Sequence, residues 1–137
     1  ARLDGLDLSP RMLEEAARRG VYAALHEADL ETFLPLHPGA WDLVAAADVL
    51  NYLGDLAPSL RGIAGALAPG GLAAFSIETG KGGGYALGEG LRYRHDPAHV
   101  AALGAAAGLS EVARDDVTLR EERGNPVHGT LFVFRRA

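Results

Sequence analysis

Residues 5–13, with the sequence GLDLSPRML, join a short apolar run to a helical pattern. The run from Leu3 to Leu8 predicts a strand. Ser9 follows as a candidate N-cap, and Pro10 suits the first helical position because the N–H it lacks would have no partner there. Apolar and charged residues then recur at helical spacing as far as Gly20, which suits a left-handed helix stop. The stretch therefore predicts a strand that leads directly into an amphipathic helix.

Strands and helices alternate along the rest of the chain. The expected strands run from Leu25 to Asp29, from Trp41 to Ala47 and from Leu72 to Ile77, and the expected helices run from about Ala57 to Leu67 and from Asp96-Pro97 to a stop at Gly108. The segment from Trp41 to Ala47 is apolar except for Asp42, which is typical of a strand covered on both faces. This alternation predicts an α/β fold with parallel βαβ units.

Two more strands are expected at the C-terminal end, near Leu109 to Leu119 and near His128 to Arg135. Only Glu121 to Val127 separates them, which is too short for the crossover that parallel strands need, so the pair should be antiparallel. The chain shows no internal repeat and no linker. We therefore expect a single domain over residues 1–137.

The composition limits the class of protein. With 48% hydrophobic residues the chain can fill a core, and a net charge of −5 provides no cationic surface for nucleic acid or an anionic membrane. The longest uncharged stretch, Gly62 to Ile77, is shorter than a membrane span and is broken by Pro69. The chain has no cysteine, which excludes disulfides and thiolate metal sites and fits a cytoplasmic protein.

The segment from Thr79 to Gly90 holds six glycines around Lys81, Tyr85 and Glu89. A flexible loop at the carboxyl end of a strand is a common place for ligands. The glycines lack the G-x-x-x-x-G-K-[ST] spacing of nucleoside triphosphatases, and no G-x-G-x-x-G occurs in the chain. These patterns argue against a phosphate-binding loop and against a plain nicotinamide-dependent oxidoreductase.

Asp7 is the most informative single residue. An acidic side chain at the tip of a strand in a doubly wound sheet can accept both hydroxyls of a ribose, and Asp7 stands at such a tip. Taken alone, the same carboxylate serves equally well as a cap for the helix that begins after Ser9. The residue by itself leaves both interpretations open.

Four stretches in order resemble consecutive motifs of the class I S-adenosylmethionine-dependent methyltransferases. They are GLDLSPRMLEEAARRG (5–20), EADLETFLP (27–35), WDLVAAADVLNYLGDL (41–56) and LAPGGLAAFSIE (67–78). The last two are most similar to bacterial predicted methyltransferases that are associated with tetratricopeptide repeats. The resemblance implies a Rossmann-like sheet, mostly parallel with a C-terminal antiparallel pair, and S-adenosylmethionine as the cofactor.

The resemblance also assigns cofactor contacts. Asp7 would take the ribose hydroxyls, with Leu8 and Met12 along the adenosine. Asp29 resembles the acid that takes the adenine amino group, and the backbone amide of Leu30 would lie beside the ring. Without the resemblance, an N-cap or turn role for Asp29 would be the simpler explanation.

Further contacts are implied after the third expected strand. The backbone near Ala47 would approach the methionine part of the cofactor, although small side chains there also suit close packing of a helix on the sheet. The residues that the resemblance places around the substrate are Asn51, Tyr52, Tyr85, Tyr93 and His95. We therefore expect the substrate to lie between this strand end and the glycine-rich segment.

The sequence assigns no catalytic base and no metal ligand. Asn51 cannot take a proton, and Tyr52 fits half-buried packing equally well. His95 suits a general base near neutral pH and, beside Asp96, suits a helix start to the same degree. The other histidines, which show no metal-ligand spacing, are His26, His37, His99 and His128.

The family's first strand ends in a glycine-rich loop, and this sequence begins after such a motif. In the family's strand order, 3-2-1-4-5-7-6, the absent strand would lie between the strands that end at Asp7 and at Ala47. An unfilled gap there would leave two rows of backbone groups without partners, at a high cost in free energy. A longer natural protein, direct pairing of the flanking strands, or a strand from a second chain would each resolve the gap, and we expect the first.

Two functions are consistent with these patterns. The first is methyl transfer from S-adenosylmethionine to a small-molecule acceptor, in which the protein mainly aligns donor and acceptor. The second is a methyltransferase-like module that binds a partner or a nucleoside without turnover, which the absent glycine-rich loop favours. Neither nucleic acid nor a membrane is an expected partner, and a homodimer is left open.

Overall fold

The computed structural model describes residues 1–137. Its N-terminal unit consists of β1 (Asp4–Asp7), α1 (Pro10–Arg18) and β2 (Ala24–Glu27), and the two strands pair in parallel. Ser9 caps α1 as predicted, because its hydroxyl accepts the backbone N–H of Met12 at 3.3 Å. Gly20 has a φ of 66°, which confirms the predicted stop after this helix.

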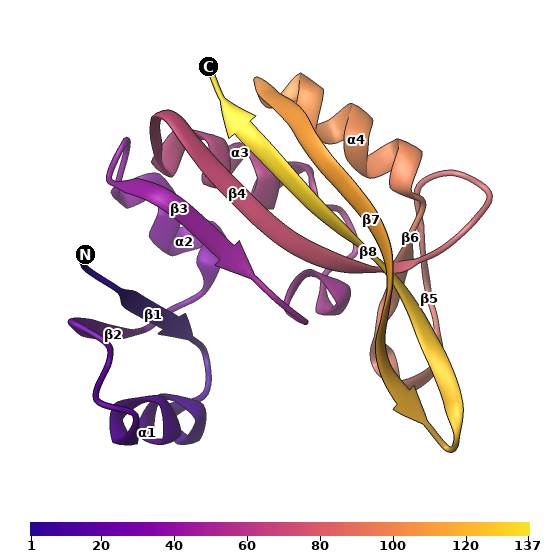
Figure 1. Ribbon diagram of the computed structural model, residues 1–137, viewed down its shortest axis with the longest axis horizontal. Coiled ribbons are helices and arrows are strands. Elements are labelled where there is room, and N and C mark those ends of the chain that lie inside the picture. Colours follow the sequence, from indigo (N-terminus) through magenta and orange to yellow (C-terminus); the bar gives the residue numbers. More distant parts are fainter.

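The main sheet is centred on β4 (Leu67–Thr79), as Figure 1 shows. β4 pairs in parallel with β3 (Trp41–Ala46) and, at its carboxyl end, with β6 (Tyr93–His95). On its other side it pairs antiparallel with β8 (Asn125–Arg136), and β7 (Leu109–Glu122) lies beyond β8. The short β5 (Tyr85–Leu87) pairs antiparallel with β6. The predicted antiparallel C-terminal pair is thus confirmed.

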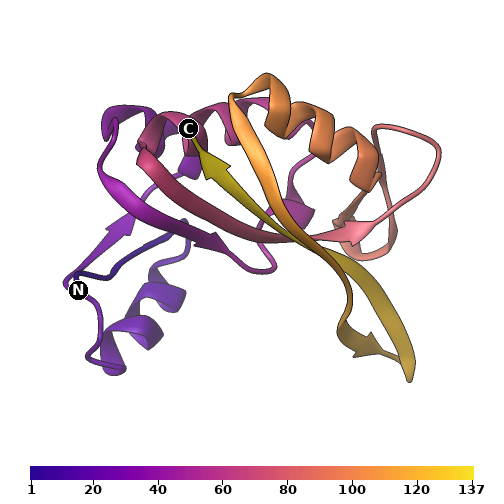
Figure 2. The ribbon, with the colours of Figure 1, turned by 45° about the horizontal axis from the view of Figure 1, so that its top comes forward.

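Helices cover one face of the main sheet. α3 (Ala57–Ala66) and α4 (Pro97–Ala106) lie side by side on that face, and the opposite face carries no helix (Figure 2). The other helical elements are short: α2 (Leu30–Phe33), η1 (Leu34–Leu36), η2 (Leu50–Tyr52) and η3 (Glu89–Leu91). None of the helices has the length and apolar character needed to cross a membrane.

The core lies between these helices and the main sheet. Phe75, Phe132 and Phe134 are buried and stack with ring centroids 5.5 to 5.7 Å apart. α4 approaches them at Gly104, where a Cβ atom would lie only 2.6 Å from the Phe134 ring. Burial of these rings is the largest apolar contribution to the fold.

The sheet differs from the expectation of a mostly parallel arrangement. Three strand pairings are parallel, β1–β2, β3–β4 and β4–β6, and the three that involve β5, β7 or β8 are antiparallel. The chain is therefore an α/β fold with a mixed main sheet. The antiparallel β5–β6 pair was not expected and causes the difference, whereas the β7–β8 pair, with only residues 123–124 in its turn, was expected.

Three local predictions were wrong. β3 is not covered on both faces, since Leu43 is 58% exposed on the face without helices. β4 begins at Leu67, directly after α3, and absorbs Pro69 and the two glycines in a bulge opposite β3. The glycine-rich segment is not a continuous loop, because β5 and η3 form within it. Pairing with β6 supplies the hydrogen bonds that sequence spacing alone did not reveal.

The predicted gap lies between β1 and β3. The two strands belong to separate sheets, so the alternative in which they pair directly is wrong. A groove of about 410 Å³ separates them, and 14 of its 17 lining residues are hydrophobic, among them Leu6, Phe33 and Val44. Figure 1 shows β1 and β3 pointing in the same direction across this groove.

Candidate functional site

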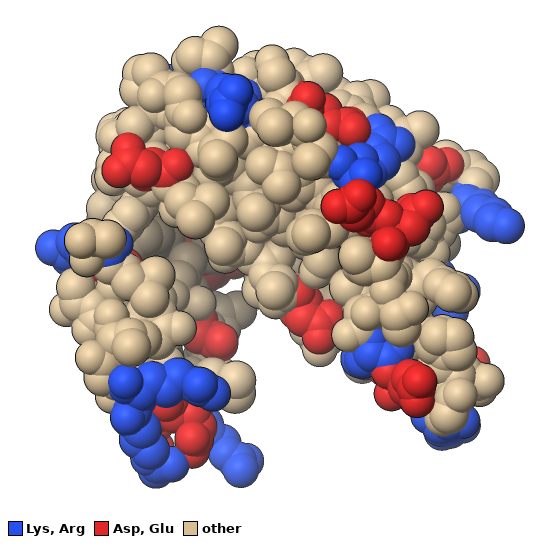
Figure 3. Space-filling view, in the orientation of Figure 1, with Lys and Arg blue, Asp and Glu red and all other residues tan.

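The molecule is hollowed between the N-terminal unit and the tip of the β7–β8 hairpin, as the space-filling view shows (Figure 3). β3 runs toward this hollow from the main sheet, and β1 runs toward it from the N-terminal unit (Figure 1). In α/β folds, ligands bind at the carboxyl ends of parallel strands. The residues that follow β1, β2 and β3 are therefore the first candidates for a binding site.

Asp7 is the last residue of β1, and its two carboxylate oxygens allow it both to support the start of α1 and to bind a ligand. Its Oδ1 accepts the backbone N–H of Ser9 at 2.9 Å, which is the helix-entry role. Its Oδ2 has no partner in the protein and remains free to accept a hydrogen bond from a ligand. The two interpretations of Asp7 thus do not exclude one another.

The other expected cofactor contacts of the N-terminal unit lie near the same edge. Leu8 and Met12 are 68% and 56% exposed, an unusual degree for apolar side chains that flank a free carboxylate oxygen. Asp29 stands at the N-cap of α2 but makes no cap hydrogen bond; its Oδ2 accepts the Thr32 hydroxyl at 3.3 Å. Leu30 is half-buried and packs against the core instead of standing free.

These residues fit an adenosyl group. Exposed apolar side chains can cover a purine ring, and a carboxylate oxygen without a partner can accept the hydroxyls of a sugar. Ala47 is exposed just after β3 and leaves room for a close approach from the hollow. The chain thus offers surfaces for the nucleoside part of S-adenosylmethionine at the ends of β1 and β2.

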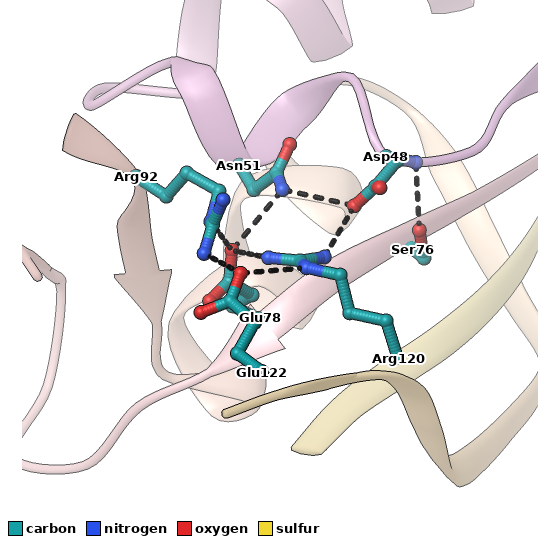
Figure 4. Close-up of polar contacts among 7 residues, drawn as sticks. All are labelled: Asp48, Asn51, Ser76, Glu78, Arg92, Arg120 and Glu122. Atoms are coloured by element: carbon teal, nitrogen blue, oxygen red, sulfur yellow. Dashed lines mark hydrogen bonds and ion pairs between the residues drawn. The ribbon is translucent and has the colours of Figure 1, made fainter. Parts of the chain in front are cut away.

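An ionic cluster follows β3 on the side of the main sheet, and its members are Asp48, Asn51, Glu78, Arg92, Arg120 and Glu122 (Figure 4). Glu78 is the penultimate residue of β4, and its side chain is only 7% exposed. Its Oε2 lies 3.0 Å from Nη2 of Arg120, 3.1 Å from Nδ2 of Asn51 and 3.0 Å from Nε of Arg92. The Arg92 contact is an ion pair without an aligned hydrogen bond, because that N–H finds no acceptor in line.

Arg120 connects the hairpin to the strand ends. Its guanidinium also donates to Asp48 at 2.9 Å and to Glu122 at 3.0 Å, and Arg92 forms a further ion pair with Glu122. The hydrogen bond from Arg120 holds the pKa of the Glu122 carboxyl below its ordinary value of 4.5. The ion pairs of the two arginines with these carboxylates hold the hairpin and the β5–β6 region against the end of β4.

Asp48 carries backbone strain at the centre of this arrangement. Its φ is 58°, and its backbone N–H donates to the Ser76 hydroxyl of β4 at 3.1 Å. Asn51 is 1% exposed and donates to Asp48 at 3.0 Å as well as to Glu78. A flipped Asn51 amide would set its oxygen against two carboxylates, so Oδ1 must face away from them, where it is buried without a partner. Such an orphaned acceptor is a candidate contact for a ligand N–H or O–H.

Tyr85, Tyr93 and His95 meet on the β5–β6 hairpin, which confirms that the structure brings three of the expected substrate residues together. The Tyr85 and Tyr93 rings are 5.8 Å apart, edge to face, and each lies within 6.5 Å of the His95 ring. Gly54 lies against both tyrosines, with its missing Cβ only 3.0 Å from Tyr85. Tyr52 is 58% exposed and has no recorded contact with these rings.

His95 is not placed for proton transfer. It is fully buried as the last residue of β6, and neither ring nitrogen has an aligned hydrogen-bond partner. Burial lowers its pKa, so the neutral imidazole is favoured. His95 stands directly before the start of α4, and the cap itself is Asp96, which accepts the backbone N–H of Ala98 at 3.0 Å.

Sequence reasoning missed the charged members of the ionic cluster. Glu78 ends a quoted motif and could have been found as an acid at a strand tip. Arg92, Arg120 and Glu122 carried no local signal, because the long hairpin and the β5–β6 turn alone bring them to Glu78. The predicted strands were shorter than β7 and β8 are, so the sequence did not predict that Arg120 and Glu122 reach Glu78.

Sequence comparison finds related proteins over about half of the chain. A family model described as "Methyltransferase domain" matches residues 1–75. The ubiquinone biosynthesis O-methyltransferase of Sodalis glossinidius is 34% identical over 80 residues, or 56% of this chain and 32% of that protein. The trans-aconitate 2-methyltransferase of Pseudomonas aeruginosa is 42% identical over 71 residues, or 52% of this chain and 25% of that protein. The chain thus spans about a third or less of these relatives.

Solved structures share the fold of the whole chain. A putative S-adenosylmethionine-dependent methyltransferase from Listeria monocytogenes matches with a TM-score of 0.77 at 16% identity, over 99% of this chain and 80% of that one. The 1,6-didemethyltoxoflavin-N1-methyltransferase of Burkholderia thailandensis, solved with S-adenosylhomocysteine, matches with a TM-score of 0.78 at 17% identity, over 99% and 61%. The [4+2]-cyclase SpnF matches with a TM-score of 0.77 at 17% identity, over 98% and 66%.

At these identities the structural matches show the fold alone, a Rossmann-like α/β arrangement. The match of the family model is independent of them and extends over the strands and helices that carry Asp7, Asp29 and Asp48. Because that match covers more than half of its 137 residues, the chain belongs to the methyltransferase-domain family.

Proposed function

We propose that this chain binds S-adenosylmethionine at the ends of β1 and β2 and takes part in methyl transfer to a small-molecule acceptor. The observation that carries the proposal is the free Oδ2 of Asp7, with the exposed side chains of Leu8 and Met12 in the same short segment, in a chain of the methyltransferase-domain family. The bound cofactor would supply an electrophilic methyl group on a sulfonium sulfur.

The residues of the chain divide the work of binding. Asp7 would hold the sugar hydroxyls, Asp29 and the backbone of Leu30 would contact the adenine, and Ala47 would allow the sulfonium end to approach β3. The acceptor would lie on the side of the ionic cluster, beyond the carboxyl end of β3. Alignment of the two reactants and exclusion of water are then the main contributions of the protein.

Three tyrosines complete the proposed acceptor site. Tyr85 and Tyr93 form a fixed edge-to-face pair, and Tyr52 stands exposed after η2. His95 supports the two paired rings from beneath as a neutral packing residue. No residue in this set is proposed as a general base.

We further propose that an additional parallel strand occupies the groove between β1 and β3 and joins both sheets within one domain. Both strands present an edge without a partner to this groove, and its lining is apolar. Such edges are costly unless they are paired. The motif phrases also support the bacterial subgroup associated with tetratricopeptide repeats as the nearest type.

The named relatives support a small-molecule acceptor, because they are called methyltransferases of a ubiquinone pathway and of trans-aconitate. The second candidate function is a methyltransferase-like binding module without turnover. A chain named as a [4+2]-cyclase shares the fold, so the fold does not by itself require methyl transfer. Fold alone therefore does not decide the chemistry.

Calorimetric titration of S-adenosylhomocysteine separates these functions. It is titrated into residues 1–137 and into the same residues joined to an additional strand before β1. Binding by either one supports the cofactor site, and binding only when the strand is present supports the additional strand as well. If neither binds, the methyl-transfer proposal is wrong and the module remains.

The Asp7→Ala variant tests the site itself. It should weaken S-adenosylhomocysteine binding by about 1–3 kcal/mol, because hydrogen bonds to a carboxylate are lost. Glu14→Ala, which removes an exposed acid from α1 of the same unit, is the matched control and should leave the dissociation constant unchanged. An unchanged constant for Asp7→Ala would remove this residue from the site.

A further inference from the structure

A second cavity lies between the β5–β6 region and the tip of the β7–β8 hairpin. Its volume is about 890 Å³, and only one of its 12 lining residues, Val127, is hydrophobic. The groove between β1 and β3 has the opposite character, since it is smaller and almost wholly apolar. A cavity of this size and polarity is suited to a small, strongly polar molecule.

The lining of this cavity holds equal numbers of arginines and glutamates, but two of its arginines have no partner. Arg94 and Arg123 line it, and neither guanidinium forms an ion pair or a hydrogen bond with any residue. Glu78 and Glu122 also line it, but Arg92 and Arg120 of the ionic cluster already pair with both. Glu89 is the one lining acid without a partner, so two free cations face one free anion, with His128 beside them.

The glycines of the preceding segment make room for the arginines of this wall. A Cβ at Gly80 would lie 3.0 Å from the Cβ of Arg94, and one at Gly88 would lie 3.6 Å from its Nε. A Cβ at Gly90 would lie 3.5 Å from three guanidinium atoms of Arg92. Within this segment Gly80 therefore packs tightly against β6, whereas Gly82, Gly83 and Gly84 have positive φ values and a Cβ there would meet no other atom within 4 Å.

Arg123 stands at a strained position in the hairpin turn. Its φ is 50°, and Gly124 follows with a φ of 78°, so the turn needs two left-handed residues. Asn, Asp or Gly is preferred at the first of these positions, and arginine there costs conformational energy. Because the Arg123 side chain lines the cavity, binding of a ligand by its guanidinium would account for this strained position.

We propose that this cavity binds the carboxylate groups of the methyl acceptor through Arg94 and Arg123, so that the acceptor is a small molecule with at least two separated carboxylates. This proposal rests on the proposed function for its methyl-transfer context, although anion binding at the cavity is a property that can be tested alone. A guanidinium presents parallel N–H donors that match a carboxylate. Two of them on separate elements, a strand and a turn, select a molecule with two anionic ends.

The position of the cavity fits an acceptor site. Glu78 and Glu122 form part of its wall and belong to the ionic cluster, whose Asp48 follows the carboxyl end of β3. An acceptor anchored by Arg94 and Arg123 would extend past this cluster toward the hollow where the cofactor is proposed to bind. The ionic cluster would then hold the hairpin in place around the acceptor.

The test titrates citrate into the chain and follows backbone amide shifts by NMR. Saturable shifts are expected in residues 88–94 and 123–128, with little change in β1 and β2. Triethyl citrate, which has the same skeleton without charge, should produce no saturable shift. Arg94→Gln and Arg123→Asn should each weaken citrate binding about tenfold, as loss of one charge-assisted contact predicts. Asn is favoured at position 123, so that variant should keep its fold.

Arg135→Gln is the matched control, because it removes an exposed, unpaired arginine from the other end of β8 and changes the net charge equally. Three results would each overturn the proposal. Arg135→Gln could weaken citrate binding as much as the two test variants do, triethyl citrate could bind, or inorganic phosphate could bind more strongly than citrate. S-adenosylhomocysteine is titrated in parallel. If S-adenosylhomocysteine binds and citrate does not, only the carboxylate proposal is wrong. If citrate binds, and S-adenosylhomocysteine binds neither residues 1–137 nor these residues with the additional strand, the methyl-transfer proposal is wrong and the anion site stands.

Discussion

The N-terminal unit is packed less tightly than the main sheet. No residue before Leu34 is buried, and β1, α1 and β2 hold only partly covered or exposed side chains. The main sheet and its helices contain all 25 buried residues, with three stacked phenylalanine rings at their centre. Yet the family model matches residues 1–75, which include the poorly buried unit and exclude two of those rings. The family model thus covers both the poorly buried unit and more than half of the 25 buried residues.

This contrast indicates a division of labour. Side chains that do not fill a core are free to contact a ligand, and Asp7, Leu8 and Met12 are in that condition. Regions with few buried contacts also open locally at a lower free energy than the rest of a protein. We therefore expect the N-terminal unit to be the part whose order depends most on a bound ligand or on a strand in the groove beside β1.

The largest effect should come from the core of the main sheet. Phe75→Ala should lower the free energy of unfolding by about 3–5 kcal/mol, because it leaves a cavity between Phe132 and Phe134. Leu25→Ala in β2 should cost only about 1 kcal/mol, since Leu25 is half-buried. Urea unfolding curves of both variants check the prediction. Equal losses would show that the N-terminal unit is as tightly packed as the main sheet.

Helix caps provide a smaller and more local comparison. Asp96 accepts the backbone N–H groups of Ala98 at 3.0 Å and of Gly83 at 2.8 Å, whereas Ser9 accepts only that of Met12 at 3.3 Å. Asp96→Ala should therefore cost about 1–2 kcal/mol, and Ser9→Ala about 0.5–1 kcal/mol. The same unfolding measurement ranks the two. A greater loss for Ser9→Ala would contradict the geometry of the two caps.

The main sheet and the N-terminal unit should also lose stability in different pH windows. This pH dependence should be smaller than the effects of the core and cap substitutions. Burial lowers the pKa of His95 below its ordinary value of 6.5, so as pH falls through that value the unfolded chain gains a proton that the folded chain does not, and stability falls. His95→Phe should remove this dependence, as read from unfolding in urea on either side of pH 6.5.

Asp4 in β1 titrates in a separate range. The hydrogen bond from Arg2, with a second from His26, holds the pKa of the Asp4 carboxyl below its ordinary value of 3.8. Its contribution is present above that pH and is lost as pH falls through the lower, folded-state pKa. A loss of stability near neutral pH that persists in His95→Phe would show that the two regions do not titrate separately.

Much of the local structure could be predicted from particular residues. Ser9 and Pro10 marked the start of α1, Asp96 marked that of α4, and the short spacing after Leu119 made the last two strands antiparallel. Strand ends were less accurate, because pairing with neighbours extends β4, β7 and β8 beyond their apolar runs. Backbone pairing, unlike capping, depends on residues far away in the sequence.

The candidate site divides in the same way. Asp7, Leu8, Met12 and Asp29 could be found because each follows a strand within a short motif. The burial of His95 could not, since Tyr85, Tyr93 and η2 surround it only after the β5–β6 hairpin forms. The ionic cluster likewise unites residues up to 72 positions apart.

The sequence by itself determined the order of the elements, their caps and the position of an acid at the end of β1, because these depend on local spacing and backbone preference. Only the tertiary structure decided that β1 and β3 stand apart across an apolar groove and that Arg94 and Arg123 face one cavity without partners. Contacts between distant residues depend on how strands pair and how long they extend, and those are outcomes of packing that no short stretch of sequence contains.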